Sequence, residues 1–255
     1  MDSNRVAVVI MAAGKGTRMK NPEKAKVMYE VDGKPLIRHV VELALKLKSA
    51  RTIVVVGYQY KTVVEYLQKT FPGRVEFAEQ SDQLGTGHAV MQTESALRDF
   101  SGDVIVLSGD APLLTQATIE RLQEYHQRER AVATILTADI DDPKSYGRIV
   151  RTEKGLVESI VEERDADEET KKIHEINSGI YIFQRSVLFD ALKHISPHNA
   201  QNEYYLTDVF KYFWTCGLKV AAMKTGDFNE ILGVNTFEQL EEAQQFFNAR
   251  KQAKL

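Results

Sequence analysis

The chain has 255 residues, enough for one large domain or two small ones. Its 33 Lys and Arg residues against 36 Asp and Glu residues leave a formal charge of −3, which argues against a general binder of nucleic acid or of anionic membranes. A hydrophobic content of 43% and a charged content of 27% exclude a globally disordered chain. The single cysteine, Cys216, excludes an internal disulfide and a metal site built from several cysteines.

We expect no export signal at the start of the chain. The apolar run after Arg5 is too short for a signal peptide or for a membrane span. One cysteine also fits a reducing compartment. We therefore expect a cytoplasmic protein without a membrane partner.

The first half of the chain alternates between strand and helix patterns. Short runs rich in Val and Ile predict buried strands, and apolar residues spaced three and four apart predict helices. We expect strands over residues 5–11, 52–56, 75–78 and 103–107, and helices over 35–48, 61–71, 86–97 and 115–128. This alternation with short links is typical of an open parallel sheet with helices on both faces.

The second half has fewer helices. Strand patterns occupy residues 131–137, 147–151, 156–161 and 177–183, and one helix is expected over 186–194. These patterns predict a mixed extension of the sheet. Thr236 and Gln239 form a capping-box pattern that opens a last helix. Because no repeat or low-complexity linker divides the chain, we expect one domain over residues 1–235 and a C-terminal helix over 236–255.

A glycine-containing segment, residues 12–19, follows the first strand directly. Its two glycines allow a tight turn whose free N–H groups can face phosphate oxygens, and Lys15 and Arg18 add positive charge. The segment lacks the end of a Walker A loop, and Met19 stands where the dinucleotide fingerprint requires a glycine. An ordinary strand-to-helix turn is the alternative, but the combination of small residues and cations favours a phosphate site.

Further candidates have both a structural and a functional interpretation. Lys26 precedes a turn, and a lone lysine is usually a surface charge. Gln80, Gly85 and Thr86 lie near the start of a predicted helix, where Thr86 can cap the helix or the backbone can approach a ring or phosphate. Asp110 follows a strand that ends in glycine, which puts it at the edge where open α/β sheets bind ligands; a turn or cap residue is the alternative.

A series of motifs in order resembles the sugar-nucleotidyltransferase family over about residues 5–240. Within that family, the set as a whole is most similar to the bacterial uridylyltransferases that act on N-acetylglucosamine-1-phosphate. The motifs lie at residues 12–19, 33–35, 83–89, 109–113, 146–151, 160–162, 175–177, 203–208 and 233–235.

The resemblance implies a Rossmann-like nucleotidyltransferase fold and an enzyme that depends on Mg²⁺. Its reaction would be transfer of UMP from UTP to N-acetylglucosamine-1-phosphate, giving UDP-N-acetylglucosamine and pyrophosphate. Uridylyl or thymidylyl transfer to another sugar-1-phosphate, such as glucose-1-phosphate, is the nearest alternative. A non-catalytic sensor of nucleotide sugars is disfavoured, because Arg18, Lys26, Asp110 and Asn235 are all present.

The resemblance also implies the roles of individual residues. The catalytic residues would be Arg18, Lys26 and Asp110; the nucleotide-binding residues Met11, Ala12, Ala13, Gly14, Gln80, Gly85, Thr86, Ser108 and Gly109; the sugar-binding residues Gly147, Glu162 and Asn177; and the Mg²⁺ ligands Asp110 and Asn235. Cations can neutralise a triphosphate, and hard oxygen atoms suit Mg²⁺. The Gln80 amide can flip, so alone it does not exclude cytosine.

Two departures from the family pattern change the expectations. Ser108 stands where the family usually has a tyrosine, which removes an aromatic ring near the sugar. The full-length bacterial enzyme carries an acetyltransferase β-helix made of hexapeptide repeats. No such repeat follows residue 240, so we expect no acetyltransferase domain in this chain.

Overall fold

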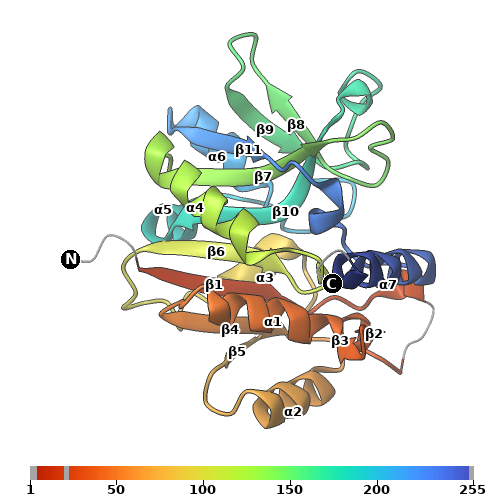
Figure 1. Cartoon of the computed structure of the whole chain (residues 1–255). Helices are drawn as coiled ribbons and strands as arrows, with labels where there is room; N and C mark the ends of the chain where they lie inside the picture. Colours follow the sequence, from red (N-terminus) through yellow and green to blue (C-terminus); the bar gives the residue numbers. More distant parts are fainter. Residues whose placement is uncertain (1–4, 20–22, 253–255) are drawn as a thin grey trace.

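The computed structural model describes residues 5–19 and 23–252 (Figure 1). Their centre is a nine-stranded sheet in the order β11-β7-β10-β6-β1-β4-β5, to which β8 and β9 attach through β10. The strands are β1 Val6–Met11, β4 Arg51–Val56, β5 Glu76–Glu79, β6 Asp103–Ser108, β7 Ala133–Asp139, β8 Arg148–Arg151, β9 Val157–Val161, β10 Glu175–Gln184 and β11 Val220–Lys224. A separate hairpin joins β2 Glu30–Val31 to β3 Lys34–Pro35.

The strand directions confirm an α/β fold with a mixed, mostly parallel sheet. Strands β5, β4, β1 and β6 are parallel, β10 runs antiparallel between β6 and β7, and β11 is parallel to β7. The helices are α1 Leu36–Lys46, α2 Tyr60–Thr70, α3 Thr86–Met91, α4 Gln116–Glu129, α5 Arg185–Ala191, α6 Asp208–Thr215 and α7 Phe237–Gln252, with short 3₁₀ turns at η1 Thr17–Met19, η2 Lys26–Met28, η3 Thr170–Lys172 and η4 Phe228–Ile231.

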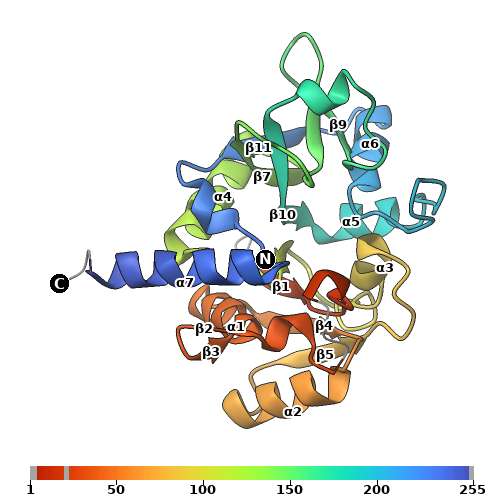
Figure 2. The same ribbon diagram turned by 90° about the vertical axis from the view of Figure 1, so that its right-hand side faces the viewer.

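Helices cover both faces of the sheet, as the sequence predicts. In β1, Ala7 and Val9 face a core shared with α3, α5 and α6, whereas Val8 and Ile10 face a second core shared with α1, α2 and α4 (Figure 2). These four strand residues are fully buried. A strand covered on both faces has apolar residues at consecutive positions. This explains the unbroken apolar run of β1.

The last helix packs away from the two main cores. In a third, smaller cluster, Ala243 of α7 is buried with Val31 of the hairpin and with Leu113, which follows β6. Val234, just before α7, belongs to the same cluster. This packing brings Val234 and the start of α7 to the carboxyl edge of β1 and β6, as Figure 1 shows.

Most predicted elements are present within a few residues, with three differences. Helix α3 ends at Met91 instead of residue 97, because the Gln92 and Thr93 side chains donate to backbone carbonyls of the last turn and compete with helix propagation. The sequence analysis did not predict α6 or β11. Both belong to the part of the fold that lies beyond β10. Helix α6 buries Val209, Phe210 and Phe213, and β11 pairs with β7.

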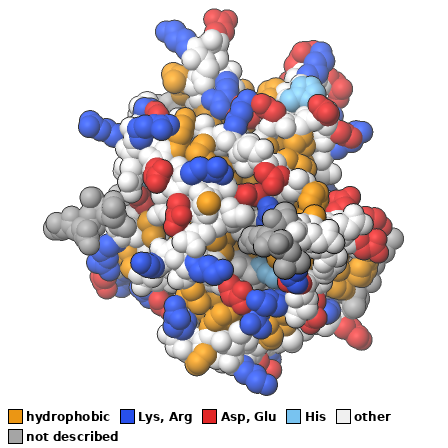
Figure 3. All heavy atoms as spheres, in the orientation of Figure 1, with side chains coloured by type: hydrophobic (Ala, Val, Ile, Leu, Met, Phe, Trp, Pro, Cys, Tyr) orange, Lys and Arg blue, Asp and Glu red, His pale blue; other side chains and the backbone are white. Residues whose placement is uncertain are grey.

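The surface is mixed in charge. On the face in Figure 3, acidic and basic side chains alternate instead of gathering by sign, in agreement with the near balance of charges in the sequence. Cys216 is exposed and unpaired. Within residues 5–19 and 23–252, no helix has both the length and the apolar character needed to cross a membrane.

Helix α6 supplies a test of the packing. Phe210 is fully buried with its ring centroid 5.6 Å from that of Phe183, whereas Trp214 on the same helix is 37% exposed. Phe210→Ala should lower the free energy of unfolding by about 3–5 kcal/mol, and Trp214→Ala by less than about 1 kcal/mol. Urea denaturation followed by circular dichroism measures both; equal losses would contradict this packing of α6.

Candidate active site

A cavity of about 460 Å³ opens at the carboxyl ends of β1 and β6. It collects most residues that the resemblance assigns to the nucleotide and its phosphates: Met11, Ala12, Ala13, Gly14, Lys26, Gln80, Gly85, Thr86, Ser108 and Asp110. Gly109 lies between them, where its N–H donates to the Met11 carbonyl at 2.9 Å. A Cβ at Gly109 would stand 2.9 Å from that same carbonyl oxygen, so the close approach of the two strand ends requires a glycine.

The first glycine loop also positions Lys26. Gly16 has a φ of +61°, and a Cβ there would lie 2.6 Å from the Lys26 Cβ. An L-residue at this position would be strained and would push Lys26 away. Gly16 therefore lets the lysine chain pass close to the loop and reach the cavity.

Four polar side chains from distant parts of the chain meet at this edge. The Lys26 ammonium pairs with the Asp110 carboxylate and donates to Asn235 Oδ1 at 2.9 Å. The Arg18 guanidinium donates to the same oxygen at 2.9 Å. The Lys26 and Asp110 side chains are only 16% and 14% exposed, so water screens their interaction poorly.

The end of β6 and the start of α7 hold this cluster together. Asp110 follows β6, and its carbonyl accepts a hydrogen bond from Val234 N–H at 2.9 Å. The next residue, Asn235, is fixed by its backbone N–H to Gln239 Oε1 at 2.8 Å and by Nδ2 to the Gly233 carbonyl at 3.1 Å. These bonds leave Asn235 Oδ1 facing the cations.

Asp110 and Asn235 fit a divalent cation. Their oxygens already converge on one positive group, the Lys26 ammonium, and carboxylate and amide oxygens are hard ligands. Among the described residues, no group of three or more His, Cys, Asp or Glu side chains could hold a metal. A metal here would therefore take its remaining ligands from phosphate oxygens and water.

At the other end of the cavity, Gln80 is buried and its amide orientation is fixed. Its Nε2 donates to the Gly85 carbonyl at 3.0 Å. A carbonyl only accepts, so this bond removes the flip that the sequence left open. Thr86 does not cap α3, because Gly85 occupies the N-cap position; the Thr86 hydroxyl instead accepts from Leu206 N–H at 3.0 Å.

Gly85 has a backbone that few other residues could adopt. Its φ is +110°, and a Cβ would lie 2.6 Å from the Tyr204 carbonyl oxygen. The segment that precedes α3 therefore packs closely against the backbone of Tyr204.

The three predicted sugar-binding residues form a second cluster. Asn177 of β10 donates its N–H to the Gly147 carbonyl at 2.8 Å, and a Cβ at Gly147 would be 3.4 Å from Glu162 Oε2. Ser108 connects this cluster to the nucleotide cavity, because its hydroxyl lies 3.5 Å from the Gly179 carbonyl oxygen. The structure therefore brings both predicted groups to one edge of the sheet.

Glu162 is electrostatically unusual. Burial raises the pKa of its carboxyl group, and the carboxylates of Asp208, Asp165 and Glu203 raise the pKa further. The Thr207 hydroxyl, which donates to Glu162 Oε1 at 3.0 Å, acts in the opposite direction. The ionised form of Glu162 is thus less favoured here than in water.

Tyr146 is a residue of this region that the sequence analysis left without a role. Burial and the charge of Asp110 raise the pKa of its phenol, and the charge of Arg18 lowers it. The phenol therefore lies within the electric field of the cluster formed by Arg18, Lys26, Asp110 and Asn235. In the sequence, the feature that could have identified Tyr146 is its position at the start of the motif over residues 146–151.

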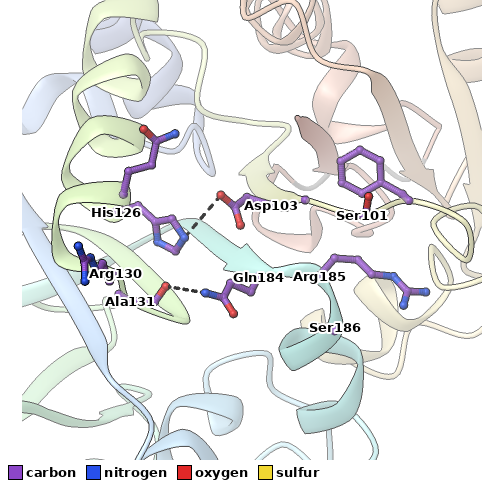
Figure 4. A pocket seen from close by; sticks show the side chains of 11 residues that line it. Ser101, Asp103, His126, Arg130, Ala131, Gln184, Arg185 and Ser186 are labelled. Carbon is purple, nitrogen blue, oxygen red and sulfur yellow. Dashed lines mark hydrogen bonds and ion pairs between the residues drawn. The ribbon is translucent and has the colours of Figure 1, made fainter. Parts of the chain in front are cut away.

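A larger cavity, of about 750 Å³, lies at the opposite edge of the sheet, where β6 begins (Figure 4). None of the predicted site residues lines it. His126 Nδ1 pairs with Thr134 Oγ1 at 2.7 Å, and His126 Nε2 lies 3.7 Å from Asp103 Oδ2. The ring therefore ties α4 to β7 and β6, which is a structural role.

The chain is similar to known proteins in sequence and in fold. The family described as "Nucleotidyl transferase" matches residues 7–249. The chain is 49% identical to the "Bifunctional protein GlmU" of Halalkalibacterium halodurans, over 97% of this chain and 53% of that protein. It is 45% identical to the protein of the same name from Bacillus subtilis, over 95% of this chain and 52% of that protein. The chain thus spans about half the length of the curated relatives it matches.

A solved structure supports the fold. UDP-glucose pyrophosphorylase complexed with UDP-glucose superposes with a TM-score of 0.78, over 96% of this chain and 99% of that chain, at 18% identity. At that identity the likeness concerns the fold alone. Since the family match covers almost the whole sequence, the chain belongs to the nucleotidyl transferase family.

Proposed function

We propose that this chain transfers UMP from UTP to N-acetylglucosamine-1-phosphate, giving UDP-N-acetylglucosamine and pyrophosphate. One observation carries the proposal: two cations and two hard oxygen ligands meet beside a nucleotide-sized cavity that adjoins a polar cluster suited to a sugar. The identity with relatives named GlmU, together with the sequence resemblance, supports this pair of substrates over others.

The nucleotide would lie along the end of β1. Backbone groups of residues 11–14 would hold the base and ribose, and Gln80 and Thr86 would meet the edge of the uracil. Because Gly85 fixes the Gln80 amide, its Oε1 is the atom left to accept a hydrogen bond from the uracil N–H. Ser108 and Gly109 would border the nucleotide on the β6 side.

The chemistry requires positioning and charge neutralisation. An oxygen of the sugar-1-phosphate attacks the α-phosphorus of UTP in line, the bond to the β-phosphate oxygen breaks, and pyrophosphate leaves. A phosphate monoester is already an anion, so no general base is needed. Arg18 and Lys26 would stabilise the negative charge that builds on the triphosphate oxygens as pyrophosphate departs.

Asp110 and Asn235 would hold Mg²⁺ through one oxygen each. When bound, this ion would neutralise phosphate oxygens and orient the triphosphate. Asn235 lies two residues before α7, so we propose that the catalytic domain spans residues 1–235 and that the segment over 236–255, which contains α7, anchors its last ligand.

The sugar would lie against the cluster of Gly147, Glu162 and Asn177. Glu162 offers a carboxylate that accepts hydrogen bonds from sugar hydroxyls, and Asn177 offers both a donor and an acceptor. Gly147 leaves room, since a Cβ there would approach both side chains.

The reaction itself is the first test. With Mg²⁺, UTP and N-acetylglucosamine-1-phosphate, the chain should release pyrophosphate and form the UDP-sugar. A matrix of four nucleoside triphosphates against several sugar-1-phosphates, compared by kcat/KM, checks the substrate pair. A clear preference for dTTP, CTP or glucose-1-phosphate would overturn the assignment. No activity with any pair would favour a non-catalytic sensor of nucleotide sugars.

Asp110→Asn tests the metal pair. The substitution keeps the shape but removes the only formal charge that the two proposed ligands offer an ion. We expect kcat to fall by at least about 10²-fold, or about 2.7 kcal/mol of barrier, with little change in Tm. Asn235→Ala should act in the same direction, and the double variant should be far from additive because both residues act through one ion.

The matched control is Asp103→Asn, at the other end of the same strand β6. It should keep normal turnover. Near-normal turnover of Asp110→Asn at saturating Mg²⁺ would instead identify Asp110 as a turn residue.

Glu162→Gln tests the buried carboxyl. Because the folded protein raises the pKa of Glu162, folding favours its protonated form, and that stabilisation is lost as the pH rises through the raised pKa. The variant should therefore have a higher Tm than the wild type at pH 8, and the difference should vanish near the usual carboxyl pKa. Its KM for the sugar phosphate should rise about tenfold at pH 8, since charged acceptors bind hydroxyls more strongly.

Calorimetric scans and initial rates at several pH values measure both effects. A lower Tm at pH 8, or an equal rise in the KM for UTP, would mean that Glu162 maintains the fold and does not serve the sugar.

A further inference from the structure

Tyr181 contacts Asn177, one of the three predicted sugar-binding residues, from within the protein core. It lies in β10 with 2% of its surface exposed, and its phenol oxygen accepts a hydrogen bond from Asn177 Nδ2 at 2.8 Å. The other side of the same amide is held as well, because Asn177 Oδ1 accepts from Gly179 N–H at 3.1 Å. Asn177 is therefore fixed on both sides.

An irregularity in β10 makes this contact possible. Residues four apart in a regular strand are separated by about 13 Å, too far for a hydrogen bond between their side chains. The pairing of β10 with β7 shifts register between Asn177 and Tyr181, and Gly179 between them has a φ of +76°. The bulge shortens the strand and turns the two side chains toward each other.

The core alone does not account for the hydroxyl. The Tyr181 ring packs with its centroid 5.5 Å from those of Phe183 and Phe210, and a phenylalanine would fill the same space. A buried hydroxyl is costly unless it forms hydrogen bonds. Its benefit must therefore come from the groups it contacts, which are in the sugar cluster.

Tyr181 is also coupled to Glu162. Burial raises the pKa of the Tyr181 phenol, and the negative charge on Glu162 raises it further. The phenol oxygen accepts a hydrogen bond from Asn177. Tyr181 is thus bonded to one of the side chains proposed to bind the sugar and lies in the electric field of the other.

We infer that the Tyr181 hydroxyl is a positioning group that holds the Asn177 side chain in place for the sugar phosphate; this inference rests on the proposed function. Tyr181 itself is buried in the core, so the role proposed for it involves no contact with the substrate. It acts on the sugar half of the site and not on the nucleotide half.

Tyr181→Phe is the direct experiment, because it removes one oxygen and keeps the ring. The KM for N-acetylglucosamine-1-phosphate should rise by about fivefold or more, the scale of one lost hydrogen bond in the site. The KM for UTP and kcat should stay within about twofold of the wild type. Thr134→Val, which removes a buried hydroxyl bonded to His126 at the opposite edge, is the control and should leave both KM values unchanged.

A double-variant cycle separates positioning from general loosening. In an Asn177→Ala background, Tyr181→Phe should have much less effect on the sugar KM than in the wild type, because the contact is already absent. Full additivity, an unchanged sugar KM, or an equal rise in both KM values would overturn the inference. A wild-type chain inactive with every substrate pair would overturn the proposed function, and the inference with it.

Discussion

The candidate site depends on one backbone hydrogen bond, from Val234 N–H to the carbonyl of Asp110. It fixes the end of β6 against a segment that lies more than a hundred residues further along the chain. Asn235 follows at once, and its Oδ1 accepts from the same Lys26 ammonium that pairs with Asp110. Without this closure, the sheet would still present Asp110 at its edge, but Asn235, the second proposed oxygen ligand, would be absent. Helix α7 stabilises the closure through a small apolar cluster of its own, and Gln239 fixes the backbone at its start.

The site is an edge at which two different halves of one sheet meet. The parallel strands β1, β4 and β6 present their carboxyl ends together, which provides the loops and the charges proposed to bind the nucleotide. The antiparallel β10 and the β8–β9 pair contribute the polar cluster proposed for the sugar. Ser108, at the end of β6, contacts Gly179 in β10, so the two halves join where the parallel and antiparallel parts of the sheet adjoin. A change of strand direction within one sheet therefore separates the two proposed substrate sites and keeps them adjacent.

Local periodicity was enough to predict the alternation of strands and helices, because β1, β4 and β6 are covered on both faces and so consist almost wholly of apolar residues. Helix α6 and strand β11 were not predicted. Strand β11 contains two alanines among five residues, which is a weak strand signal. The apolar pattern of α6 can be interpreted only once the face of the sheet that the helix covers is known. Neither the meeting of Asp110 with Asn235 nor the contact of Asn177 with Tyr181 follows from spacing. The first depends on chain closure between distant segments, which only the family resemblance indicated, and the second on a bulge that a strand pattern does not encode.

The Lys26 ammonium is held by the same two oxygens that are proposed to bind a divalent ion. Binding of that ion and binding of a triphosphate would therefore depend on each other. An ion that takes those oxygens must displace an internal counter-ion, which costs free energy as long as the lysine has no other anion to meet. A triphosphate provides that anion. By thermodynamic linkage, each ligand then strengthens the binding of the other by the same factor, so the protein would discriminate against free metal and free nucleotide alike in favour of the pair.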